Sequence, residues 1–110
     1  MSEQKSRARL LVDHQMMDYA PSKIEMPKYG QIVWHVMEVQ GLFDLFKSFL
    51  LLPAQYEIIG VYFDVAHAMW TLLLESEDIP LPEKGMELPL AVSTYYYEDG
   101  KISIHELKFV

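Results

Sequence analysis

The sequence predicts an α+β domain in two layers, with one main helix over residues 31–52 packed on a four-stranded antiparallel sheet or meander. Two observations support this fold class: helical spacing of apolar residues over 31–52 and four β-rich runs after residue 55. With 110 residues, the chain fits a single domain. We expect residues 1–29 to form an N-terminal arm and residues 30–110 to form the α+β domain.

The N-terminal arm is expected to hold one short ordered element. Apolar residues 10–12 suit a short strand or a helical turn, and their periodicity does not decide between the two. Pro21 and Pro27 disfavour a long helix across residues 20–28, because proline lacks an amide hydrogen and clashes with the preceding turn.

The longest regular pattern is helical. Six apolar residues recur at alternating steps of four and three, which is the spacing of one helix face: Ile32, Val36, Val39, Phe43, Phe46 and Leu50. At 100° per residue the apolar arc is about 200° wide, and its flank adds Trp34, Leu42, Leu45 and Phe49. Pro53 marks the end of the pattern. The alternative is a strand over residues 31–37, followed by a shorter helix from 40 to 52.

Four runs rich in β-branched and aromatic residues follow: 56–64, 70–76, 90–97 and 102–109. The five-residue connector 65–69 suits a hairpin, and the Asp99-Gly100 step predicts a second, tighter one. The three prolines in residues 76–89 predict a loop or a prolyl edge segment. In the last run the apolar residues change face near Glu106, which predicts a β-bulge there.

Neither face of the first two β-rich runs is polar, so both faces of this hairpin are expected to be covered. One helix covers one face. We expect a second copy of the chain to cover the surplus, with contacts from Trp34, Leu42, Leu45 and Phe49. Replacing Leu45 or Phe49 with aspartate is then expected to dissociate the assembly more than it unfolds the domain. Tyr95 and Tyr97 share one face of their strand and are further interface candidates, or else ordinary strand tyrosines at the sheet edge.

Charge is distributed unevenly along the chain. The net charge is −7, yet residues 31–110 carry four lysines against twelve carboxylates, a balance of −8. A body of this sign disfavours contact with nucleic acid. Both arginines, Arg7 and Arg9, lie in the first nine residues, and we expect them to contact the acidic body of a neighbouring copy. The alternative is an inhibitor or adaptor that presents its acidic surface to a basic site on another protein.

No motif for catalysis or metal binding is present. The four histidines lack the spacing of a zinc site, and the nearest histidine–carboxylate pair, Asp64 with His67, falls in a predicted turn. We therefore expect no enzyme activity, no metal and no cofactor. No apolar run reaches the roughly 18 to 20 residues that cross a bilayer, and the first residues lack the apolar core of a signal peptide. We expect no membrane partner and a cytoplasmic location.

These observations together predict a small, acidic, non-enzymatic binding protein that acts as a homo-oligomer. The adaptor described above is one alternative. The other is a small-ligand binder, for a nucleotide or a metabolite, with a pocket between helix and sheet lined by Trp34, Trp70 and tyrosines.

Overall fold

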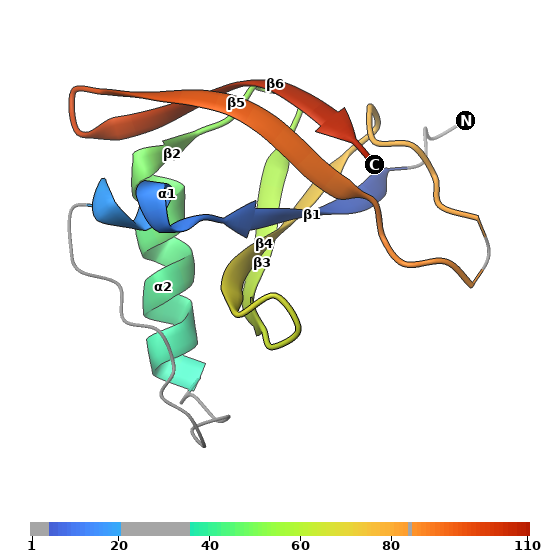
Figure 1. The fold of residues 1–110 in the computed structure, drawn as a ribbon, viewed down its shortest axis with the longest axis horizontal. Coiled ribbons are helices and arrows are strands. Elements are labelled where there is room, and N and C mark those ends of the chain that lie inside the picture. Colours follow the sequence, from blue (N-terminus) through green and yellow to red (C-terminus); the bar gives the residue numbers. More distant parts are fainter. Residues whose placement is uncertain (1–4, 21–35, 84) are drawn as a thin grey trace.

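In the computed structural model, the described residues are 5–20, 36–83 and 85–110. They form an α+β fold in which a mixed six-stranded sheet curls strongly into a half-barrel, accompanied by two short helices (Figure 1). The elements in chain order are β1 (Ser6–Val12), α1 (His14–Asp18), α2 (Val36–Phe49), β2 (Leu50–Leu51), β3 (Glu57–Asp64), β4 (Met69–Ser76), β5 (Leu90–Glu98) and β6 (Lys101–Phe109). No helix in these residues is long and apolar enough to cross a membrane.

The strand order is β2-β6-β5-β1-β4-β3. Two antiparallel hairpins, β3–β4 and β5–β6, are joined by β1, which pairs antiparallel with β4 and parallel with β5. The sheet is therefore mixed and six-stranded, and the prediction of a four-stranded antiparallel sheet with an N-terminal arm is corrected on both counts. Residues 6–12 form a strand inside the sheet because Ala8, Leu10 and Val12 alternate with outward residues and fill its core face.

The main helix is shorter than predicted at its C-terminal end. Among the described residues α2 spans Val36–Phe49, and Leu50 and Leu51 leave it to pair parallel with Ile102 and Ser103 of β6. Pro53 disfavours a helical continuation, and β6 supplies partners for the backbone groups of the two leucines. Residues 31–35 lie outside the described residues. In the alternative of a strand over 31–37, the last two residues are helical.

Both predicted hairpins are confirmed. Asp64 pairs with Met69 across the first connector, and Glu98 pairs with Lys101 across the second. Asp99 and Gly100 have φ angles of 52° and 76°, so both central residues are left-handed, as a two-residue hairpin loop with the native strand twist requires. The predicted bulge is also confirmed. The pairing passes from Thr94–Glu106 to Tyr95–Ile104, which leaves His105 as the extra residue.

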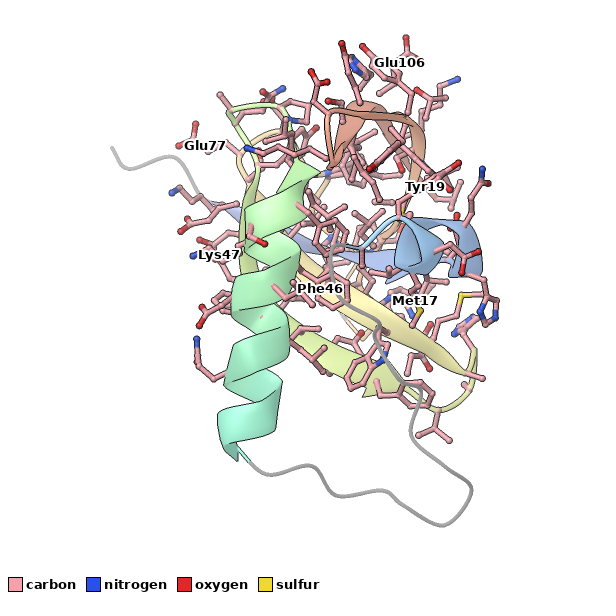
Figure 2. All side chains as sticks on the ribbon, turned by 90° about the vertical axis from the view of Figure 1, so that its left-hand side faces the viewer. Met17, Tyr19, Phe46, Lys47, Glu77 and Glu106 are labelled. Carbon is pink, nitrogen blue, oxygen red and sulfur yellow. The ribbon has the colours of Figure 1, made fainter. Side chains whose placement is uncertain are left out.

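The core lies on the inner, concave face of the curled sheet. Ala8, Leu10 and Val12 of β1 and Leu72 of β4 are each at most 2% exposed and belong to one apolar cluster. Phe46 projects from α2 toward the sheet (Figure 2) and is 0% exposed. Because α2 contacts both edge strands, β2 and β3, it closes the open side of the half-barrel.

Candidate functional site: the outer face of the sheet

The face of the sheet that points away from the core is the candidate interaction surface, and we call it the outer face. Successive side chains of a strand point to opposite faces. In β1 the buried residues Ala8, Leu10 and Val12 point to the core, so Arg7, Arg9 and Leu11 lie on the outer face. The inter-strand register then identifies which residues of the other strands share this face.

A row that includes apolar side chains runs across the outer face, with the buried Thr71 in its middle. Thr71 of β4 pairs with Tyr62 of β3 on one side and with Leu11 of β1 on the other. The β1–β5 pairing ends at Leu10 and Ala91, and Val92 is the next outward residue of β5 beyond that pair. We call Tyr62, Thr71, Leu11 and Val92 the outer row. Thr71 is 0% exposed, whereas Tyr62 is 40% and Val92 52% exposed.

Both described helices pack on the opposite, inner face. Met16 of α1 and Phe46 and Phe49 of α2 belong to the same buried cluster as the inward residues of β1 and β4. In the part of the chain that the structure describes, no helix therefore covers the outer row. The sequences of β3 and β4 are apolar on both faces, which predicts that both faces are covered. The two described helices cover only the inner face.

The two arginines lie on the outer face, next to the outer row, and each has an ion-pair partner within its own chain. Arg7 Nε lies 3.4 Å from Glu75 Oε2, across a pair in the β1–β4 register. Arg9 lies 3.6 Å from Glu87 Oε2, and its Nε donates to the carbonyl of Leu88 at 3.2 Å. The sequence-based expectation that these arginines contact a neighbouring copy rested on their having no partner in the chain, and the structure supplies one for each.

Arg9 is one of the charged groups that act on the pKa of Tyr62. Partial burial raises the pKa of Tyr62, Arg9 lowers it, and Asp64 and Glu87 raise it. Because Tyr62 is 40% exposed, it keeps its polar hydroxyl near water while its ring extends the apolar row. This combination is typical of residues that form protein interfaces.

The outer face continues along the β5–β6 hairpin. Leu90, Val92, Thr94 and Tyr96 alternate with inward residues along β5. Tyr96 is 52% exposed, and its ring stacks on His105 with centroids 4.3 Å apart. Val92 lies opposite Lys108 and Thr94 lies opposite Glu106. The hairpin thus presents an apolar line on β5 with two opposite charges beside it on β6.

Tyr95 and Tyr97 share the other face of β5, as predicted, and both contact the segment that contains α1. The Tyr95 hydroxyl lies 3.0 Å from both carboxylate oxygens of Asp13, to which it donates. Asp13 also caps α1, because its Oδ1 accepts from the amide of Met16 at 2.8 Å. Tyr97 stacks on Tyr19 with centroids 4.6 Å apart and keeps 48% of its surface exposed. Tyr95 therefore joins α1 to the hairpin.

The Tyr95–Asp13 contact predicts an alkaline effect on stability. Burial and then the hydrogen bond to Asp13 raise the pKa of Tyr95 from 10.0 to about 12. Between these two pH values the unfolded chain loses this proton and the folded chain keeps it, so the stabilising contribution falls as pH rises from 10 to 12. A tyrosinate absorbance titration should show one late step that is missing in Tyr95→Phe. If the step that Tyr95→Phe removes has its midpoint near pH 10 instead, the contact is not formed.

The helix residues predicted for the interface fall into three groups. Trp34 lies outside the described residues. Leu42 and Leu45 are half-buried and pack against the core cluster. Phe49 is 1% exposed and is a core residue of the single chain, which leaves almost none of its surface for contact with a second copy. The wide apolar arc of α2 is explained here by its position, since a helix that closes a half-barrel contacts the sheet on more than one side.

The Asp64–His67 pair lies in the β3–β4 turn and stabilises it. Asp64 Oδ1 accepts from the amides of Ala66 at 3.0 Å and His67 at 3.3 Å, and Asp64 Oδ2 lies 2.7 Å from His67 Nδ1. The hydrogen bond to the His67 side chain is the main cause that lowers the pKa of Asp64. In residues 5–20, 36–83 and 85–110, no group of three or more histidine or carboxylate side chains is placed to hold a metal ion.

The structure thus brings together residues that the sequence analysis did not select: the outer row, Tyr96, Glu106 and Lys108. A signal for them was present, since Leu90, Val92, Thr94 and Tyr96 form one alternating set in β5. The sequence alone could not show that these residues of β5 share a face with those of β1, because that relation depends on the pairing of β1 with β5. Comparison with protein families, with curated proteins and with solved structures found no match to this chain.

Proposed function

We propose that the protein is a non-enzymatic binding protein that acts as a homo-oligomer through the outer face of its sheet. The observation that carries the proposal is the outer row, in which Tyr62 and Val92 stay 40% and 52% exposed on either side of the buried Thr71. Soluble monomers rarely expose contiguous apolar patches larger than about 600 Å². A second copy covers such a patch on both chains at once.

We expect the assembly to be a two-fold dimer. A standard interface buries about 800 Å² per partner, roughly a tenth of the 7606 Å² that the chain exposes. The outer row is widened by apolar neighbours in the adjoining positions of the same face. These are Leu73, Leu90 and Val110, of which Val110 is 79% exposed. Two-fold dimers are the commonest closed assemblies, because one self-complementary patch suffices.

The test is the mass of the protein in solution. Sedimentation equilibrium over a range of concentrations should give a species of twice 12.8 kDa that dissociates on dilution. A single-chain mass at every concentration, up to the order of 100 micromolar where weak homodimers form, would contradict the proposal.

A further inference from the structure

We infer that the two copies meet through the outer faces of their β5–β6 hairpins, related by a two-fold axis that lies between the faces and at right angles to the strands. This inference rests on the proposed self-association and assigns its surface. Among the outward residues of β5, Val92 and Tyr96 are each 52% exposed, which is more than the 40% of Tyr62 in the outer row. Beside them on β6 stand two exposed residues of opposite charge, Glu106 and Lys108.

The register shows that this surface is complementary to itself. Lys108 lies opposite Val92 and Glu106 lies opposite Thr94, one step further along the same face. An axis level with Ser93, which points inward between them, brings Lys108 of each copy onto Glu106 of the other. Opposite charges therefore meet at two symmetric positions. Of the two axes that lie in the interface along or across the strands, only the one across them achieves this match.

The apolar line matches in the same arrangement. About this axis Val92 of one copy faces Thr94 of the other, and Leu90 faces Tyr96. Each contact pairs side chains of complementary size, two small β-branched residues at the centre and a leucine against an aromatic ring at each end. The centre carries no charge, and the charged residues lie to one side of it.

Glu106 and Lys108 are free for this role. Among the ion pairs of the described residues, neither side chain takes part. Both are exposed, so changing them leaves the core of the single chain intact. A partner that matches Glu106 and Lys108 needs a positive and a negative group at the same spacing as these two residues and in the reverse order along its strand. A second copy of this hairpin provides both groups, so we propose that the partner is a second copy of this chain.

The test is a charge exchange measured by the dimer dissociation constant. Glu106→Lys and Lys108→Glu each place like charges together at both symmetric positions, and each should weaken the dimer about tenfold or more. The double variant Glu106→Lys/Lys108→Glu restores opposite charges and should return the constant to within about threefold of the original. Net charge moves from −7 to −5 in the first variant and to −9 in the second, so a general charge effect cannot weaken both.

The outcomes separate the surface from the function. A dimer whose dissociation constant is unchanged in both single variants would overturn the hairpin assignment and leave self-association in place. A wild-type chain that is monomeric throughout would overturn self-association and this arrangement with it. Circular dichroism of each variant, with the same spectrum and melting transition as the wild type, shows that the comparison is made between folded proteins.

Discussion

Phe49→Ala is expected to destabilise the domain by about 3–5 kcal/mol, the range for a large aromatic side chain deleted from a core. Phe49 is 1% exposed, and its ring lies 5.7 Å from that of Phe46, which is 0% exposed. Domains of this size are stable by about 5–15 kcal/mol. The substitution therefore removes a large share of the free energy of unfolding. Urea denaturation should show a midpoint at a much lower urea concentration than that of the wild type.

The matched control for this prediction is Val65→Ala. Val65 lies in the β3–β4 turn and is 72% exposed, so its truncation should change the free energy of unfolding by no more than about 0.5 kcal/mol. The pair of variants decides between two positions for Phe49. If Phe49→Ala unfolds at the wild-type urea concentration but dissociates an oligomer, Phe49 is an interface residue, as the sequence pattern suggested, and its place in the core is wrong.

The features that the sequence predicted correctly depend on local chemistry. Asp99 and Gly100 form the β5–β6 turn because few other residue pairs accept two left-handed conformations in succession. The bulge at His105 was visible as a change of face within one run of residues. The α+β class followed from patterns of this kind, each contained within one continuous segment of the chain.

The features that the sequence analysis missed depend on pairing between distant segments. β1 lies parallel to β5 although Leu10 and Ala91 are far apart in the chain, and no local sequence pattern predicts that contact. Arg7 and Arg9 were expected to lie in an arm and to contact a neighbouring copy, yet they belong to a strand of the sheet and occupy its outward positions. Leu50 and Leu51 continue the helical apolar pattern and also suit a strand, so their spacing could not fix the end of α2.

The outer row shows the same limit for the candidate site. The sequence indicated that β3 and β4 have two apolar faces, but not which residues lie on the uncovered one. In β3 the register shifts between Ile58 and Gly60, so the residues beyond Ile59 exchange faces relative to those before it. Tyr62 is therefore outward, and only the structure places it in line with Thr71 and Leu11.

Val92→Asp is expected to give the largest effect on assembly with the smallest effect on the fold. In the single chain Val92 is 52% exposed, so an aspartate there remains in contact with water. In the proposed dimer Val92 is at the centre of the contact, where each aspartate would lose water and would draw Lys108 of its own chain away from Glu106 of the other copy. Desolvating two carboxylates commonly costs a few kcal/mol of association, which raises the dissociation constant by about a hundredfold.

The most direct measurement is the solution mass of Val92→Asp beside that of Val65→Asp at one concentration. The two substitutions introduce the same charge at exposed valines, Val65 being 72% exposed in the β3–β4 turn and outside the outer face. The account predicts a folded monomer for Val92→Asp and an oligomer with the wild-type mass for Val65→Asp. Equal masses for the two variants would contradict the claim that a second copy covers the outer face of the sheet.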